Sequence, residues 1–321
     1  MRRRLALLLI VLLPTSALFG VAACGDAATE PSRLPVTNDK EGGKGKTDSK
    51  VVDPPEETDS GTELPEASTG PGRVYAHTKD TLYIYEPVAG SLMPIAPFTF
   101  DDPLDKADII DLAVDRTGNV FGTTFNDFFS IDPATALCTH IALAGTLDYP
   151  NALSFVPAGT ADPGKETLVG YASSIGTNTA VAYVKIDTTT GAMTTIGNMN
   201  KLTTGPQYRS SGDLVSIIQD GNKTYATVKL MVDGGIGGSD LLAEVDPKDG
   251  HVIRIIGDTK QTNLFGFGYW AGKGYGFSDT GRIVEIDMST GSSVVLKTLM
   301  GDGGVALPWY GAGVTTQAPA R

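Results

Sequence analysis

Beyond residue 72, large apolar residues alternate with polar ones in short runs, and Gly, Asp, Asn and Pro fall between the runs. Alternation with a period of two is typical of β-strands that bury one face, and no stretch keeps the longer period of a helix. The pattern therefore predicts an all-β domain of roughly 245 residues, a size that barrels and propellers reach as single units.

One phrase recurs along this domain. An acidic residue opens a turn, where its carboxylate can accept bonds from backbone amides, and a Gly supplies the positive φ of a hairpin. The phrase is KIDTTTGAMTTIG at 185–197, EVDPKDGHVIRIIG at 244–257 and EIDMSTGSSVVLK at 285–297, and more loosely SIDPATALCTHIA at 130–142 and YEPVAGSLMPIA at 85–96. Each copy predicts a strand, a hairpin and a second strand.

A further strand precedes each phrase, and it places a large apolar residue beside a small one. These strands are RVYAHT (73–78), NVFGTT (119–124), TLVGYA (167–172), KTYATV (223–228) and KGYGFS (273–278). A unit that repeats about every 50 residues indicates a repeat architecture. The small residue predicts a place where neighbouring sheets crowd together.

Four units also have a strand upstream, which completes a four-stranded blade. These are DLAVD (111–115), NALSF (151–155), DLVSI (213–217) and NLFGF (263–267). The first unit lacks one, and WYGAGVTT (309–316) at the C-terminus can fill the gap and hide exposed sheet edges. The prediction is a five-bladed β-propeller with four-stranded blades, in which the C-terminal strand closes the first blade. An irregular β-sandwich is the alternative.

The repeat resembles those of several propeller groups, including the quinoprotein-like and the NHL or YVTN-type bacterial proteins. The resemblance spans residues 73–317 and concerns the fold. The Trp-Asp dipeptide of WD40 blades, the Gly-Gly of kelch repeats and the YVTN string are missing. The resemblance therefore implies a propeller and carries no catalytic motif.

The N-terminus predicts a compartment. Three arginines precede a short apolar run, and small residues lead to Val21-Ala22-Ala23-Cys24. This resembles the lipobox of bacterial lipoproteins, which implies that Cys24 is acylated and becomes the first residue of an extracytoplasmic, membrane-anchored protein in the cell envelope. Gly25 after the cysteine favours the outer membrane in a Gram-negative cell. The alternative is an ordinary secretory signal with an incidental cysteine.

The next segment, residues 24–72, contains no aromatic residue and is rich in Pro, Gly, Ser, Thr and charged residues. Such a composition buries too little apolar surface to offset the entropy lost on ordering, so we expect a disordered tether. The predicted organisation is a lipoprotein signal peptide at 1–23, the linker at 24–72, the propeller at 73–317 and a tail at 318–321.

The charge excludes one class of partner. The formal net charge is −12, and removal of the three arginines of the signal peptide makes it −15. Nucleic-acid binding needs clustered Lys and Arg, so we expect no nucleic-acid partner. Cys138 is the only cysteine besides Cys24, so no disulfide framework is expected within the chain. We expect a monomer.

The chain offers few groups for catalysis. Its histidines, His77, His140 and His251, lie within predicted strands away from the axis, and we interpret them as half-exposed surface residues. No nucleophile elbow, HExxH or P-loop motif is present. The stretch GGIGGSD (234–240) only faintly resembles a calcium-binding repeat, and a flexible hairpin loop is the favoured interpretation. We expect no cofactor and no bound metal.

One group of residues predicts a binding face, because the inner strands of a propeller begin around its axis on one face. The candidates are Asp111, Asn151, Asp213, Asn263, Trp309 and Tyr310. The longest connections, including 97–110 and 197–212, reach the same face, and such loops on a rigid scaffold commonly bind ligands. Many Asp residues near it predict an acidic surface for a cationic or metal-bearing partner. The alternative is that these polar residues only solvate a narrow channel.

These observations favour a binding or scaffolding module whose partner is a protein, a peptide or a carbohydrate. Trp309 and Tyr310 would contact that partner at the rim. The alternative is an extracytoplasmic propeller enzyme, such as a lyase, lactonase or glycosidase, that uses carboxylates at the channel mouth. A structural spacer without a ligand is the third hypothesis. The sequence does not name the ligand.

Overall fold

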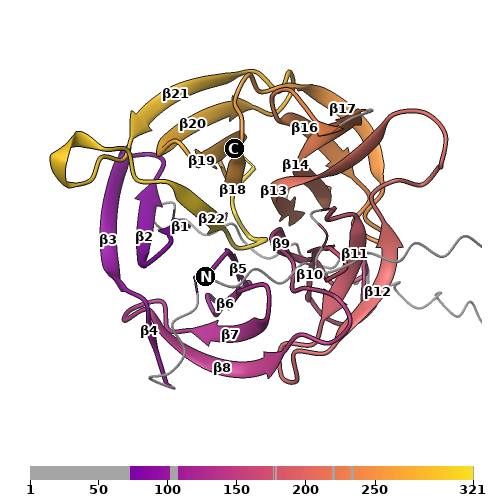
Figure 1. Ribbon diagram of the computed structural model, residues 1–321, viewed down its shortest axis with the longest axis horizontal. Helices are drawn as coiled ribbons and strands as arrows, with labels where there is room; N and C mark the ends of the chain where they lie inside the picture. The colour runs from indigo at the N-terminus through magenta and orange to yellow at the C-terminus, as the bar shows by residue number, and fades with distance from the viewer. Residues whose placement is uncertain are drawn as a thin grey trace, which may run out of the picture. The chain divides into compact units, whose positions relative to one another are not determined.

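Five antiparallel sheets stand around a common axis in the computed structural model and form a five-bladed β-propeller (Figure 1). The structure describes residues 73–101, 108–175, 177, 179–218, 221–232 and 235–320. The predicted signal peptide, Cys24 and the linker at 24–72 lie outside the described residues. Within these residues, no helix is long and apolar enough to cross a bilayer.

Each blade has four strands, ordered from the axis outward. Blade 1 is β22 (Trp309–Gly313), β1 (Val74–Thr78), β2 (Thr81–Glu86) and β3 (Ser91–Pro97); blade 2 is β5 (Asp111–Val114), β6 (Val120–Thr123), β7 (Asp127–Ile131) and β8 (Leu137–Leu143). Blade 3 is β9 (Leu153–Val156), β10 (Thr167–Ala172), β11 (Ala182–Ile186) and β12 (Met193–Asn198). Blade 4 is β13 (Gln207–Ile217), β14 (Lys223–Val232), β16 (Leu241–Val245) and β17 (Val252–Asp258). Blade 5 is β18 (Leu264–Trp270), β19 (Lys273–Ser278), β20 (Arg282–Asp287) and β21 (Ser293–Thr298).

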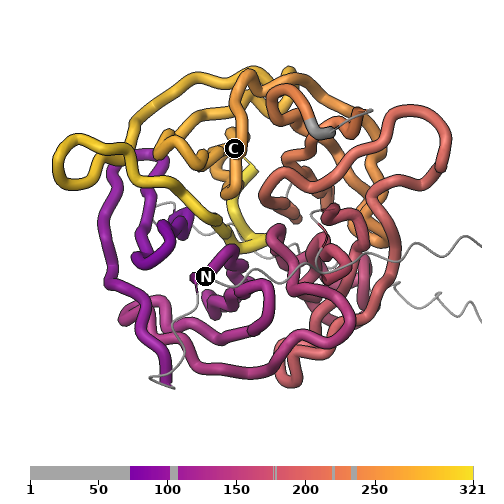
Figure 2. Tube along the Cα trace, viewed as in Figure 1, coloured from indigo at the N-terminus to yellow at the C-terminus, as the bar shows by residue number. Residues whose placement is uncertain are grey.

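The predicted closure of the ring is confirmed. β22, at the C-terminal end, pairs antiparallel with β1, so that Thr78 lies opposite Trp309 and Tyr75 lies opposite Gly313. Figure 2 shows the yellow C-terminal strand beside the indigo start of the described chain. Residues after β22 also pack on the ring, since Ala318 is fully buried and the Pro319 carbonyl accepts a bond from Ala271 N at 2.8 Å. The predicted tail is therefore packed against blade 5 over its described residues.

Two connections contain strands that the sequence pattern missed. β4 (Thr99–Phe100) lies in the predicted loop 97–110 and pairs in parallel with β8, so it covers the outer edge of blade 2. The predicted loop 197–212 is also shorter than expected, because β13 already begins at Gln207 and reaches the axis through a bulge between Ser210 and Leu214. β15 (Gly235–Ile236) pairs with the end of β14. β4 pairs with a strand about 40 residues away, whereas the extension of β13 and the strand β15 arise from pairing with β14 within blade 4.

Burial decreases from the axis outward. All six residues of β10 are buried, whereas β21 at the outer edge of blade 5 is mostly exposed. The small residue predicted in each second strand is confirmed, but its neighbour is different from the one expected. A Cβ added to Gly170 would lie 2.6 Å from Pro150 Cβ and would also overlap the Ala152 carbonyl. The crowding therefore arises within the blade, against the segment that leads into its own inner strand.

The repeated hairpins are confirmed, and the hairpin of blade 3 also bonds to the segment that precedes its blade. In blade 3, Asp187 Oδ1 accepts bonds from Thr189 N and Thr190 N, both at 2.9 Å, and these bonds lower the pKa of the carboxyl. Gly191 follows with φ of 68°, a conformation that favours glycine. The Gly191 carbonyl accepts a bond at 2.9 Å from the hydroxyl of Tyr149, which lies in the connection between blades 2 and 3. Each hairpin thus has a backbone shape that lets it seat against the preceding blade.

Candidate functional site

The two faces of the ring differ in their connections. We call the face where the inner strands begin the loop face; it carries the blade-to-blade connections and the links between second and third strands. We call the opposite face the hairpin face; it carries the repeated Asp-x-x-x-Gly turns. Residue 73 belongs to the hairpin face, because β1 runs antiparallel to β22 and begins beside Gly313, at the end of β22 away from the loop face.

Two carboxylates lie buried at the axis, just below the loop face. Asp111 Oδ1 accepts a bond from Leu112 N at 2.8 Å, and its Oδ2 accepts one from Leu153 N of blade 3 at 2.7 Å. In the same way, Asp213 Oδ1 accepts a bond from Leu214 N at 2.6 Å, and its Oδ2 accepts one from Phe267 N of blade 5 at 2.9 Å. Both side chains are fully buried. We call Asp111 and Asp213 the axial pair.

The axial pair is a structural clasp. Ala312 N of blade 1 also bonds to the pair, so every inner strand supplies at least one amide to it. Burial and the neighbouring Asp213 carboxylate raise the pKa of Asp111 well above its ordinary value, and burial raises that of Asp213. Two like charges this close favour a single shared proton. Because both carboxylates are fully buried and each oxygen accepts a backbone amide, Asp111 and Asp213 do not form an exposed binding surface, which corrects that prediction.

Close contacts between the described inner strands fill the axis at this level. A Cβ on Gly266 would lie 2.7 Å from Ala312 N, across the contact between β18 and β22. A Cβ on Gly311 would lie 2.6 Å from His77 Nε2 and would overlap the Asp111 carboxylate. Five inner strands leave little room at the centre, and glycines let them approach closely. The predicted channel is therefore a plugged axis.

Above this plug, the loop face has an apolar hollow of about 160 Å³. We call it the axial hollow, and its walls come from four blades: Ile110, Phe125, Asn151, Phe265 and Tyr310. Two of the predicted site residues, Asn151 and Tyr310, are among them. A dry cavity of about 150 Å³ can hold a benzene-sized group, so this hollow has room for about one apolar side chain.

Trp309 is not an aromatic surface at the rim, as the sequence suggested. Its side chain is fully buried and packs edge-on against Tyr83 of blade 1 and Phe277 of blade 5, with ring centroids 5.3 Å away in each case. Its Nε1–H donates to the Gly281 carbonyl at 3.1 Å. Trp309 therefore joins the closing strand to the last blade. The strand alternation puts Tyr310, the next residue, at the hollow instead.

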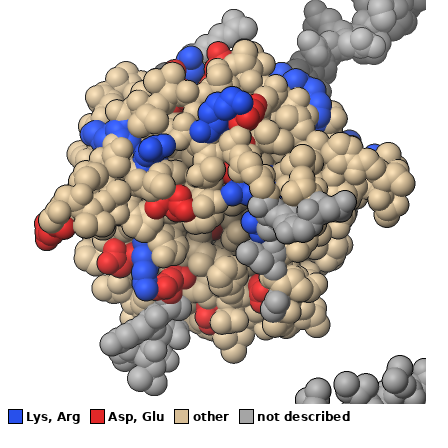
Figure 3. Space-filling view, turned by 45° about the horizontal axis from the view of Figure 1, so that its top comes forward, with Lys and Arg blue, Asp and Glu red and all other residues tan. Residues whose placement is uncertain are grey.

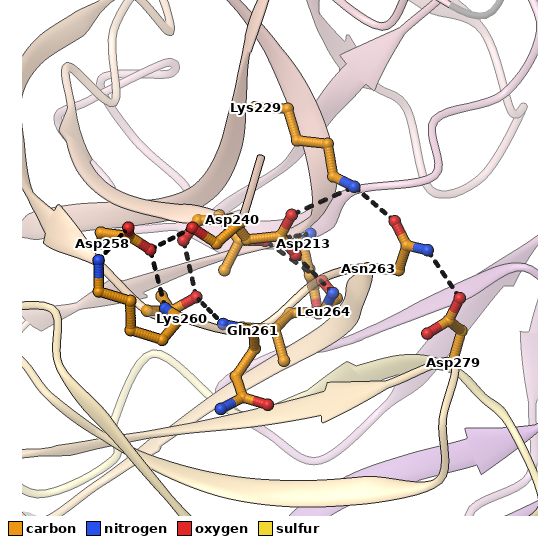
Figure 4. A network of polar contacts seen from close by, with 12 residues as sticks. Asp213, Lys229, Asp240, Asp258, Lys260, Gln261, Asn263, Leu264 and Asp279 are labelled. Atoms are coloured by element: carbon orange, nitrogen blue, oxygen red, sulfur yellow. Dashed lines mark hydrogen bonds and ion pairs between the residues drawn. The ribbon is translucent and has the colours of Figure 1, made fainter. Parts of the chain in front are cut away.

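Asn263 belongs to a polar network between blades 4 and 5 (Figure 4). Its Oδ1 accepts a bond from Lys229 Nζ, and its Nδ2 donates to Asp279 Oδ2 at 2.7 Å. Lys229 Nζ lies 3.5 Å from Asp240 Oδ1, and Asp240 Oδ2 accepts a bond from Leu264 N at 2.6 Å. Sequence reasoning missed Lys229, whose one signal was a charge within the apolar run ATVKLMV. The network is largely buried and links two blades, so Asn263 is a structural residue.

The acidic loop face expected from the sequence is partly neutralised where it is described. Asp240 pairs with Lys229, Asp258 with Lys260 at 2.5 Å, and Asp108 with Lys79 at 3.1 Å. Figure 3 shows acidic and basic side chains scattered among one another over the face that it draws. Other residues of the prediction, Asp102, Asp105, Lys106 and Asp233, lie outside the described residues. These three ion pairs reduce the negative charge that the sequence predicted for this face.

The histidines lie in three different environments. His77 is fully buried in β1, contrary to the prediction of a half-exposed residue, and burial lowers its pKa to about 4 despite the bond between its Nδ1 and the Thr78 carbonyl. His140 is half-buried in β8, and its Nε2 lies 3.2 Å from Asp127 Oδ1. His251, just before β17, has its Nδ1 2.5 Å from Asp249 Oδ1. They do not converge on the axial hollow.

Exposed hydrophobic side chains are concentrated on the loop face. Among the described residues, these side chains are Phe125, Leu143, Ile175, Leu202, Met231, Val232, Met300 and Val305. The described part of the hairpin face carries Val88 alone, and the other exposed large hydrophobic residues lie on outer strands. Scattered exposed apolar residues are ordinary, and of this group Phe125 also lines the axial hollow. Sequence reasoning missed Phe125, which is 50% exposed and whose signal was an aromatic residue in a short polar turn.

A larger groove of about 340 Å³ lies outside blade 3 on the hairpin side, and Asp162, Lys165, Lys185, Asp187 and Thr190 are among its residues. Its walls are polar, and the carboxylates of Asp162 and Asp187 already accept bonds from nearby amides. The groove is larger than the axial hollow, yet these acidic groups serve their own turns. We therefore take the axial hollow and its apolar surroundings as the candidate site.

Comparison with known proteins gives little beyond the architecture. No family model matches the chain, and the search of curated proteins found no match. A chain in a nidogen/laminin complex is 12% identical, with a TM-score of 0.45, and the match covers 75% of this chain and 97% of that one. Regucalcin from Agrobacterium tumefaciens, a calcium-binding protein, is 15% identical with a TM-score of 0.36 and 66% of each chain covered.

The WD40 β-propeller domain of Doa1 is also similar, with 12% identity, a TM-score of 0.37, and coverage of 74% of this chain and 86% of that one. All three TM-scores lie below 0.5. No argument about the function of this chain rests on these likenesses.

Proposed function

We propose that this protein is a cell-envelope lipoprotein whose propeller binds a partner protein through the loop face. The partner presents one apolar side chain to the axial hollow, and the exposed hydrophobic residues around the hollow contact its flanks. The observation that carries this proposal is the apolar hollow walled by Phe125, Phe265 and Tyr310, on the face that also carries exposed hydrophobic side chains. A buried aromatic or aliphatic anchor is the usual energetic centre of a protein interface.

The chemistry of the hollow favours a side chain over a sugar or an ion. Asn151 and the hydroxyl of Tyr310 are the polar side-chain groups of its wall, whereas carbohydrate recognition needs several converging hydrogen-bonding groups. The axial pair beneath it has all its oxygens engaged. The rival proposal of an enzyme that uses these carboxylates loses its catalytic groups for the same reason.

The position of residue 73 agrees with a lipid anchor on the other side. The described chain begins at the hairpin face, opposite the axial hollow. A tether from acylated Cys24 would therefore join the propeller on the face away from the hollow and leave the loop face open to a partner. The predicted outer-membrane location and the monomeric state remain parts of this proposal.

A random peptide library displayed on phage tests the binding face with the purified protein as bait. We expect enriched peptides to share an aromatic or large aliphatic residue, and their binding to fall at least about tenfold in the Phe125→Asp and Tyr310→Asp variants. Val88→Asp on the hairpin face, where the side chain is 81% exposed, is the matched control and should bind normally. Enrichment of peptides that bind all variants equally would contradict the proposal.

The anchor is tested separately in cells. We expect Cys24→Ser to leave an unprocessed precursor that lacks lipid, measured by mass and by partition into detergent. If the variant still matures and fractionates with membranes, the lipoprotein part of the proposal is wrong, whereas the binding face is unaffected by this result.

A further inference from the structure

The hairpin of blade 4 departs from the repeat at two positions. In every blade an acidic residue opens the turn, and in blade 4 this is Asp246. Three residues later the other blades have Ala89, Thr135, Thr190 and Thr290, and five residues later they have Ser91, Leu137, Ala192 and Ser292. Blade 4 has Asp249 and His251 at these places. The departure adds a carboxylate and an imidazole to a turn whose shape does not need them.

These three side chains come together. One carboxylate oxygen each from Asp246 and Asp249 and one ring nitrogen of His251 all lie within 4.8 Å of one another. Within the described part of the chain, no other group of three such residues meets this condition. All three are half-buried, so the site is open to solvent on one side and shielded on the other.

The turn is held rigidly against blade 3. Tyr171 Oη donates to the Gly250 carbonyl at 2.5 Å, and Tyr183 Oη donates to the Pro247 carbonyl at 3.1 Å. Val252 N, just beyond the turn, donates to the Met199 carbonyl at 3.0 Å. Both tyrosines are fully buried or nearly so. Because blade 3 fixes the backbone of this turn, the three side chains stay close together before any ligand binds.

We propose that Asp246, Asp249 and His251 form a binding site for a divalent transition-metal ion of the zinc class. One imidazole nitrogen and two carboxylate oxygens are ordinary ligands of Zn²⁺, with bonds of about 2.0–2.2 Å, and a water molecule completes four-coordination. Ca²⁺ is disfavoured because it takes about six to eight oxygen ligands. To admit the ion, Asp249 and His251 exchange their mutual hydrogen bond for bonds to the metal.

The site lies on the hairpin face at the seam between blades 3 and 4, away from the axial hollow, so it is independent of the proposed partner binding. Its ligands all come from one turn, and the tyrosines of blade 3 support that turn. An ion bound there would stabilise the folded chain by mass action, because the unfolded chain does not hold the three ligands together. Its role is therefore to stabilise the blade 4 turn, which packs against blade 3.

Calorimetric titration of the untagged, chelator-treated protein with ZnCl₂ tests the site. We expect one equivalent of Zn²⁺ to bind, and affinity to fall by about tenfold or more in Asp249→Asn and in His251→Gln, a loss that even an outer-shell partner of a metal site can cause. His140→Gln is the matched control, since His140 pairs with Asp127 without a third ligand. Circular dichroism establishes that each variant is folded.

A graft gives the complementary test. Thr290→Asp with Ser292→His copies the blade 4 pattern into the hairpin of blade 5, where Asp287 already opens the turn. We expect this variant to bind a second equivalent of Zn²⁺. Absence of saturable Zn²⁺ binding to the wild-type protein, or full retention of binding in both ligand variants, would overturn the proposal. Equal affinity for CaCl₂ would overturn the assignment to the zinc class.

Discussion

Truncation of Trp309 tests the idea that this residue closes the ring rather than binding a ligand. The indole is fully buried and joins β22 to blades 1 and 5 through Tyr83 and Phe277. Removing a buried Trp side chain costs about 3–5 kcal/mol, and the Gly281 carbonyl loses a donor worth about 1 kcal/mol. We therefore expect Trp309→Ala to lower the free energy of unfolding by about 4–6 kcal/mol.

Urea unfolding, followed by tryptophan fluorescence and circular dichroism, measures this loss. For a domain of this size about 1 kcal/mol shifts the melting temperature by about 2–4 °C, so the variant should melt roughly 10–20 °C lower. Trp309→Phe keeps an aromatic ring but loses the Nε1–H donor, and we expect a cost of about 1–2 kcal/mol.

Phe125→Ala provides the comparison, because it truncates an aromatic residue that is half-exposed on the same face. We expect that variant to stay within about 1 kcal/mol of wild type. If Trp309→Ala were no more destabilising than Phe125→Ala, Trp309 would not close the ring, and our account of the closure would be refuted.

Three further predictions concern the axis and the core. Asp213→Asn should destabilise the fold by about 1–3 kcal/mol near pH 4, because an amide of the clasp loses its acceptor, and the deficit should shrink towards pH 8. The reason is that the raised pKa of the axial pair makes the wild type lose stability as pH rises above about 4. His77, with its pKa of about 4, gives the opposite slope up to about pH 6.5, so the quantity to measure is the difference in stability between variant and wild type. A difference that does not depend on pH would contradict the shared proton. Gly311→Ala should cost about 1–3 kcal/mol in urea unfolding, since its Cβ meets His77 and Asp111, and an unchanged midpoint would argue against the plugged axis. Cys138 is fully buried, and burial raises the pKa of its thiol to about 12, so a thiol reagent should modify it only in denaturant; rapid reaction in the folded protein would be inconsistent with this burial.

The sequence by itself determined the architecture, because the residues that specify each turn and strand of the repeat lie close together in the chain. Asp187 and Gly191 specify a turn from within five residues, and the alternating strands on either side need no distant partner to be recognised. Five copies and one spare strand, WYGAGVTT, were enough to predict the number of blades and the closure. Asn151 and Tyr310 were also placed correctly beside the axis, because the start of an inner strand follows from the strand order.

Only the tertiary structure decided which of those residues face a ligand. The sequence aligned Asp111 and Asp213 with Asn151, but the strand registers match Leu112 and Leu214 with Leu153, so the two carboxylates correspond to Ala152 and lie one residue further along the inner strand. There they are buried, and amides from several blades converge on them. The neutralisation of Asp240 by Lys229 likewise depends on how the ends of β14 and β16 meet at the seam with blade 5. Burial and charge pairing arise from segments that are distant in the chain, and a local pattern carries no information about them. The exposed hydrophobic residues of the loop face likewise come from separate connections, which only the tertiary structure brings to one side of the ring.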